Sequence, residues 1–167
     1  MISFRTLSYR AATVVALASV SACSSSSAPG ADPTPARGLA WTVDGAAMST
    51  TTVQSQTGSN TVSVAGTVTN GSTSNYLSLE MPNAVGTYTF SSTARASATY
   101  STNSGTTNAV YYAGALPSSS GQNTIGAGTI VVTALTATNV TGTFTFTGIG
   151  PAGASKSITN GTFNVGL

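Results

Sequence analysis

The chain has 167 residues, only 5% of them charged, and Ser and Thr together number 55. Apolar residues still make up 40%, more than a disordered chain of low hydrophobicity carries, so we expect one folded domain with an uncharged, hydroxyl-rich surface. Outside the first ten residues, three basic side chains balance three acidic ones. Without a basic cluster to bind phosphates, a nucleic-acid partner is excluded.

The N-terminus predicts a secretion signal over residues 1–22. Arg5 and Arg10 precede an apolar run at Ala11–Val20, and small residues follow it. This order of charged, apolar and small sections is typical of signal peptides. A membrane-spanning helix would need about 20 apolar residues, and a polar run of serines begins too early for that. We therefore expect the segment to direct secretion and to be removed.

The end of this segment predicts a lipid anchor. Val20-Ser21-Ala22-Cys23 resembles the lipobox of bacterial lipoproteins, in which the cysteine thiol receives a diacylglycerol before cleavage, and Cys23 is the only cysteine of the chain. We expect Cys23 to be lipidated and to hold the protein in the bacterial cell envelope, at the outer membrane, because buried acyl chains anchor firmly. The alternative is an ordinary secreted protein with an unmodified cysteine.

Residues 23–38 predict a disordered tether between the lipid and the folded domain. Serines fill its first part, and Pro29, Pro33 and Pro35 exclude both helix and strand. We expect this segment to act as a spacer.

Residues 39–167 predict a domain built of strands. Apolar and polar side chains alternate in short runs that end at turn signals such as Asp44-Gly45 and Asn70-Gly71, which is typical of strands and hairpins. The apolar sets are Leu39, Trp41 and Val43; Val62, Val64 and Val68; Leu77, Leu79 and Met81; Tyr88 and Phe90; Val110, Tyr112 and Leu116; Ile130 and Val132; Val140, Phe144 and Phe146; and Ile158, Phe163, Val165 and Leu167. This spacing predicts about ten strands and no helix.

Short connections favour antiparallel pairing of neighbouring strands, and exposed sheet edges must be closed or covered. We therefore predict an all-β fold: a single antiparallel meander, either closed into a lipocalin-like barrel or flattened into a β-sandwich. Gly-Thr pairs open several runs, at Gly66, Gly86, Gly128, Gly142 and Gly161. We expect these glycines to mark bulges or tight turns.

Three segments carry a family resemblance: the opening Gly38–Gly45, the run Val140–Phe146 and the closing Ile158–Val165. Together with the lipobox and the tether, they resemble an uncharacterised family of small bacterial envelope lipoproteins, whose all-β domain is a domain of unknown function. The shared motifs are turns, bulges and core positions. The resemblance therefore implies the architecture and no catalytic residue.

The composition argues against catalysis. The chain has no His, which removes the usual general base and the commonest metal ligand. Asp44 and Glu80 are the only acidic residues of the domain. A glycosidase needs two carboxyl groups about 5–9 Å apart. However, the position of Asp44 is explained by a turn, and that of Glu80 by the solvent side of a strand. Ser155-Lys156 fits a solvated turn better than a catalytic dyad. We expect no enzyme activity, no cofactor and no metal site.

Two binding features remain. Val110 and Leu116 set the inward phase of their strand, so we expect Tyr112 in the core and Tyr111 outside, where its ring could stack on a sugar. These tyrosines are the candidate ligand-binding residues. An outward row of threonines over 141–147 resembles an ice-binding array, but the strand propensity of Thr alone produces such rows.

The sequence thus predicts a membrane-anchored envelope lipoprotein whose β domain binds or scaffolds rather than catalyses, with a glycan or an envelope protein as partner. One alternative is a barrel that holds a carbohydrate or a lipid in an internal cavity lined by Tyr88, Phe90, Tyr112, Phe144 and Phe146. A glycosidase-type enzyme is the less favoured alternative.

Overall fold

The computed structural model describes residues 35–91, 93, 95–114 and 126–167. The predicted signal peptide, Cys23 and the tether up to residue 34 lie outside the described residues, as does Leu116. The described residues belong to one compact unit. Among them, no helix combines the length and the apolarity that a membrane span requires.

The domain is all-β, as predicted, and its described part contains eleven strands and one short 3-10 turn. The elements are β1 (Gly38–Val43), β2 (Ala46–Thr50), β3 (Val53–Thr57), β4 (Thr61–Asn70), β5 (Thr73–Pro82), β6 (Gly86–Thr89), β7 (Ser97–Ser104), β8 (Thr107–Gly114), β9 (Ala127–Leu135), β10 (Asn139–Ile149), η1 (Pro151–Gly153) and β11 (Ser155–Gly166). The ladders between these strands are antiparallel.

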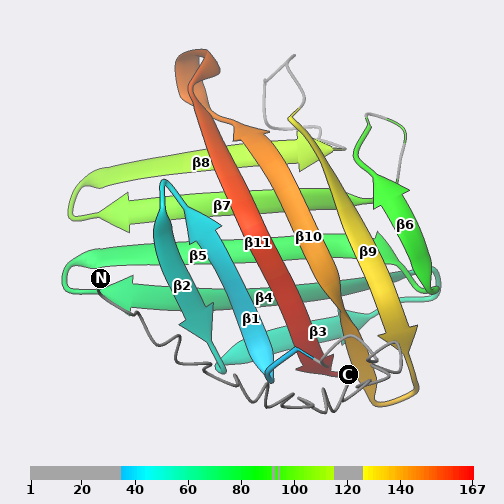
Figure 1. Cartoon of the computed structure of the whole chain (residues 1–167). Coiled ribbons are helices and arrows are strands. Elements are labelled where there is room, and N and C mark those ends of the chain that lie inside the picture. The colour runs from blue at the N-terminus through cyan, green and yellow to red at the C-terminus, as the bar shows by residue number, and fades with distance from the viewer. Residues whose placement is uncertain (1–34, 92, 94, 115–125) are drawn as a thin grey trace, which may run out of the picture. The chain divides into compact units, whose positions relative to one another are not determined.

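The strands form a single sheet that folds nearly into a barrel. Its order is β2-β1-β11-β10-β8-β7-β5-β4-β3, and β9 pairs with both β10 and β6. In Figure 1, β3, β4, β5, β7 and β8 form one layer, and β2, β1, β11, β10 and β9 cross it as a second layer. The predicted barrel and the predicted flattened sandwich therefore describe the same folded sheet.

Two ladders join strands that are far apart in the sequence. β1 lies beside β11, with Leu39 opposite Phe163, and β6 lies beside β9, with Tyr88 opposite Ile130. At the edge of the other layer, the Ser55 hydroxyl of β3 donates a hydrogen bond of 2.7 Å to the backbone oxygen of the last β11 residue. These contacts close the sheet at places where consecutive hairpins alone would leave it open.

The hairpin between β1 and β2 turns at Asp44 and Gly45, as the sequence predicts. Both residues have positive φ angles, 50° and 81°, which is the backbone conformation that Asp-Gly pairs adopt in tight hairpin turns. Val43 and Ala46 are paired directly before and after the turn. Asp44 therefore stands at the tip of the hairpin.

The core lies between the two layers and consists of the inward side chains of alternating positions. The largest fully buried side chains are Trp41, Phe163, Leu39, Leu77, Leu79, Met81, Ile130 and Ile158. Phe144 stacks on Phe163 with 6.4 Å between ring centroids, and Phe90 meets Phe146 edge-on at 6.1 Å. The predicted inward sets of these strands are thus confirmed.

Glycines in β10 and β11 make room for the aromatic rings. Gly142 lies opposite Phe163 and Gly161 lies opposite Phe144, and a methyl group on either glycine would collide with the ring across from it. The register between β9 and β10 shifts next to Gly142, and that between β10 and β11 shifts between Phe144 and Phe146. The irregularities predicted at these two glycines are therefore present.

The predicted orientation of the two tyrosines of β8 is wrong. Tyr111 belongs to the core with 8% of its surface exposed, whereas Tyr112 is half-buried and points to the outer face because neighbouring strand residues alternate. Gly148 of β10 and Gly150, directly after the end of that strand, explain the reversal: a Cβ on Gly150 would come within 2.7 Å of the Tyr111 ring. The two glycines leave an inward space that the Tyr111 ring fills, and Val110 is only half-buried.

Candidate functional site

Within the described residues, side chains fill the interior of the barrel. Phe90, Phe144 and Phe146 are buried and contact one another, and Tyr88 is half-buried with its hydroxyl donating to the Ala84 backbone oxygen at 2.8 Å. These aromatic side chains were the predicted lining of an internal ligand cavity. They pack as core instead, so a ligand-binding site is expected on the outer surface.

A groove runs over the outer face of β3, β4 and β5. Its two adjoining hollows measure about 290 Å³ and about 120 Å³, and Gln54, Ala65 and Tyr76 line both of them. Tyr76 has 38% of its surface exposed. The further lining residues are Thr52, Ser55, Gln56, Ser63, Val64, Gly66, Thr67 and Ser78. We refer to these two hollows together as the Tyr76 groove.

The register of three strands brings the groove residues to one face. Gln54 of β3 lies opposite Ala65 of β4, which lies opposite Ser78 of β5. Directly opposed residues of antiparallel strands point to the same side of a sheet. Tyr76 precedes Ser78 by two positions along β5 and therefore shares that side.

The groove combines an aromatic face with neutral hydrogen-bonding groups. The Tyr76 ring offers an apolar surface and a hydroxyl, and that hydroxyl has no protein partner among the described residues. The amides of Gln54 and Gln56 can both donate and accept hydrogen bonds. The described lining contains no charged side chain, and Glu80 stands beyond it, opposite Ser63. This chemistry suits a neutral ligand rich in hydroxyl groups.

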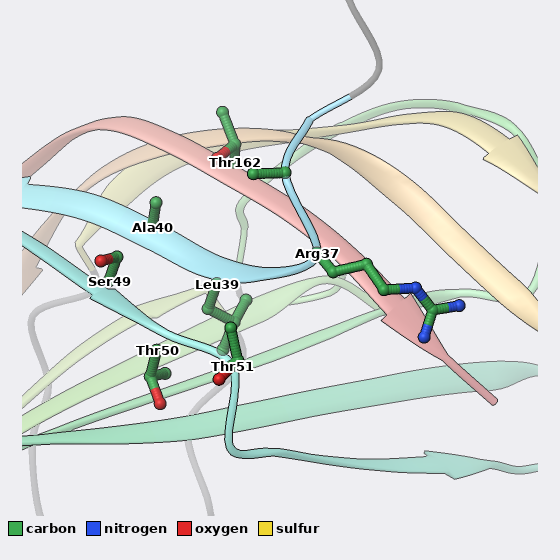
Figure 2. A pocket seen from close by; sticks show the side chains of 8 residues that line it. Arg37, Leu39, Ala40, Ser49, Thr50, Thr51 and Thr162 are labelled. Carbon is green, nitrogen blue, oxygen red and sulfur yellow. The ribbon is translucent and has the colours of Figure 1, made fainter.

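A second hollow, larger than either part of the Tyr76 groove, lies where the chain enters β1. It measures about 530 Å³ and is lined by Ala36, Arg37, Leu39, Ala40, Ser49, Thr50, Thr51 and Thr162. Figure 2 shows the guanidinium group of Arg37 directed away from Ser49 and Thr50. The lining has neither an aromatic ring nor a charge aimed inward, so its larger volume offers less to recognise a ligand than the Tyr76 groove does.

The two acids of the domain have different surroundings. Asp44 forms an ion pair with Lys156 at the start of β11, and this hydrogen bond raises the pKa of the Lys156 amine, while partial burial lowers it. Lys156 is thereby engaged with Asp44 rather than with the exposed Ser155. Glu80 stands exposed on the outer face of β5. Asp44 thus has a structural role as turn residue and ion-pair partner.

A polar pair is buried in the core near Asp44. Tyr100 of β7 donates its hydroxyl to Asn75 Oδ1 of β5 at 2.7 Å, and both residues are buried. Burial raises the pKa of Tyr100, and the charge of Asp44 and the neighbouring Tyr111 raise it further. The Tyr100 ring also lies 6.2 Å from that of Tyr111. Because its hydrogen bond is made inside the core, this pair stabilises the fold.

The threonine row of β10 points outward, as predicted, over most of its length. Thr143, Thr145 and Thr147 are exposed, whereas Thr141 is buried and its hydroxyl lies 3.2 Å from that of Thr133. The Thr145 hydroxyl donates to a backbone oxygen of β11 at 3.1 Å. Two of these hydroxyl groups are thus engaged with the sheet itself, and the strand propensity of Thr is sufficient to explain the row.

Sequence reasoning did not single out the residues of the Tyr76 groove. The position of Tyr76 beside the inward Leu77 was enough to place it on the outer face. The two glutamines were harder to place, because β3 contains a single apolar residue, Val53, and shows no alternation. Among the described residues, no group of three or more His, Cys, Asp or Glu could hold a metal ion.

The fold and the groove define a small antiparallel β domain, nearly closed into a barrel, with an uncharged groove on its outer face. Residues 40–166 match the family model described as Domain of unknown function (DUF6252), and the chain belongs to this family. The match runs from β1 to the end of β11 and covers the domain part of the resemblance noted in the sequence. No curated protein and no solved structure matches the chain.

Proposed function

We propose that this protein is a lipid-anchored lipoprotein of the bacterial cell envelope whose β domain binds a neutral glycan in the Tyr76 groove. The main support for this proposal is Tyr76, which has 38% of its surface exposed in a groove lined by amides and hydroxyls. A saccharide presents C–H faces that stack on aromatic rings and hydroxyl groups that pair with amides. The chemistry of the groove therefore matches that of a neutral saccharide.

The charges around the groove favour a neutral glycan over an acidic one. Glu80 stands next to the groove, opposite Ser63, and would repel carboxylate or sulfate groups. Lys156 is already paired with Asp44. An acidic polysaccharide would need basic side chains along its path, and the described lining of the groove has none.

The test of the groove is calorimetric titration of the purified full chain with neutral oligosaccharides of the cello-, xylo-, laminari- and N-acetylchito- series. Tyr76→Ala should lower the affinity about fivefold to tenfold, because it removes a stacking contact of about 1 kcal/mol or more. Tyr76→Phe should bind nearly as well as the wild type. Val85→Ala is the matched control, since it truncates a side chain that is 60% exposed outside the groove. Absence of binding to every neutral series would refute the proposal.

We propose further that the domain does not catalyse. The double variant Asp44→Asn, Glu80→Gln keeps the shapes of both side chains and removes both charges, so it should bind the same glycan and leave the cellular role intact. If the wild type hydrolyses a bound glycan and the folded double variant does not, the protein is a glycosidase and this part of the proposal is wrong.

The anchor is proposed from Cys23 at the end of the lipobox-like segment. Cys23→Ser should abolish incorporation of labelled fatty acid and release the protein into the soluble fraction, because both lipidation and signal cleavage depend on the thiol. A wild type that takes up no labelled lipid, with a variant that still sediments with membranes, would contradict the anchor.

A further inference from the structure

We propose that the ligand is a linear glycan that continues from the Tyr76 groove across β7 to Tyr112 on β8. The two tyrosines would then hold different sugar residues of one chain. This inference rests on the proposed function of the groove and adds the length and the direction of the ligand.

The strand register supplies the path between the two rings. Ser78 of β5 lies opposite Thr99 of β7, which lies opposite Tyr112 of β8, so all three side chains share the outer face. Tyr76 lies opposite Ser101 in the neighbouring row. Figure 1 shows β5, β7 and β8 side by side in one layer.

The side chains along this path continue the chemistry of the groove. Ser78, Thr99 and Ser101 stand between the two tyrosines, are half-buried and carry hydroxyl groups that can donate and accept. The Tyr112 hydroxyl, like that of Tyr76, has no protein partner among the described residues. The path is therefore neutral and bears hydroxyls between two aromatic ends. We refer to it as the tyrosine track.

The spacing of the two rings sets the minimum length of the ligand. β5 and β8 are separated by two strand intervals of about 4.8 Å, and the two tyrosines are offset by two residues along the strands, so their Cα atoms lie roughly 12 Å apart. This separation exceeds the size of one monosaccharide ring. A glycan that stacks on both tyrosines must therefore be an oligosaccharide that crosses the strands diagonally.

The opposite layer of the barrel presents a different surface. The outer face of β10 carries Thr143, Thr145 and Thr147 and no tyrosine. It offers hydroxyls without stacking rings. If hydroxyl groups alone recognised the glycan, this face would bind as well as the tyrosine track, so Thr143→Ala serves as the matched control for a face that the proposal leaves unoccupied.

The experiment compares the chain-length dependence of binding in variants of the purified full chain. Disaccharides to hexasaccharides of the series that the wild type binds are titrated against the wild type and the Tyr76→Ala, Tyr112→Ala, Tyr112→Phe and Thr143→Ala variants. Circular dichroism verifies that each variant is folded. We expect wild-type affinity to rise with chain length until both rings are occupied, as the additional contacts accumulate.

Tyr112→Ala should lower hexasaccharide affinity about fivefold and leave disaccharide affinity unchanged, whereas Tyr76→Ala should weaken both. Tyr112→Phe keeps the stacking ring and should lose less hexasaccharide affinity than Tyr112→Ala, and Thr143→Ala should bind as the wild type does. If Tyr112→Ala binds every length normally while Tyr76→Ala does not, the track is refuted and the groove stands. If the wild type binds no oligosaccharide at all, the track and the proposed function both fail.

Discussion

The two adjacent tyrosines of β8 should differ sharply in their contribution to stability. Tyr111→Ala removes a ring that is 8% exposed, lies 6.2 Å from the Tyr100 ring and covers Gly148 and Gly150. Replacing a buried aromatic ring by Ala costs about 3–5 kcal/mol, because the burial of the ring is lost and a cavity is left behind. Tyr112→Ala truncates a half-buried ring on the outer face, so we expect a cost of about 1 kcal/mol or less.

Urea unfolding of the full chain, followed by circular dichroism and by the fluorescence of the buried Trp41, measures both free energies. Tyr111→Phe is the control for the hydroxyl group. That hydroxyl has no hydrogen bond among the described residues, so this variant should stay within about 0.5 kcal/mol of the wild type. Equal costs for the two alanine variants, or a larger cost at Tyr112, would refute the assigned orientation of β8.

Two further predictions concern the core and pH. In the same unfolding assay, Phe144→Ala should lower the free energy of unfolding by about 3–5 kcal/mol and Thr143→Ala by about 0.5 kcal/mol. The reason is that the Phe144 side chain is buried and the Thr143 side chain is exposed. Similar losses for the two variants would contradict the alternation of β10. Lys156 and Tyr100 both have a pKa raised above their ordinary values of 10.5 and 10.0, so the stability they contribute is complete below those values and is lost as the pH rises through the folded-state values. The melting temperature should therefore fall from about pH 10 upward. A melting temperature that stays constant or rises in that range would contradict this prediction. Lys156→Gln should remove only a small part of the fall, because the ion pair is partly exposed.

The fold class followed from local pattern alone. Period-two runs such as Leu39–Val43 and Val140–Phe146 place alternate side chains on opposite faces, whatever strand lies beside them. The Asp44-Gly45 turn was equally local, because positive φ angles at two successive positions favour that pair. The Gly-Thr pairs at Gly142 and Gly161 were local signals of another kind, because glycine within a strand pattern indicates a bulge before its partner strand is known.

Other features required the paired strands. The inward phase of β8 could not be assigned from its own residues, since Tyr111 and Tyr112 are equally large. Gly148 on β10 and Gly150 just after it are both distant in sequence from β8, and they decide which ring is buried. β3 carries no apolar alternation at all. It becomes a strand because β4 supplies its hydrogen-bonding partner.

The sequence by itself determined that this chain forms a single β domain with few charged side chains on its surface, because alternation and composition are properties of the residues alone. The tertiary structure decided that β1 closes on β11 and that β3, β4 and β5 combine Gln54, Tyr76 and Ser78 in one groove. Alternation specifies the face to which a side chain points but not the strand that lies next to it. Neighbours are selected by the ladders and core contacts that close the whole sheet, and the groove exists only once those neighbours are in place.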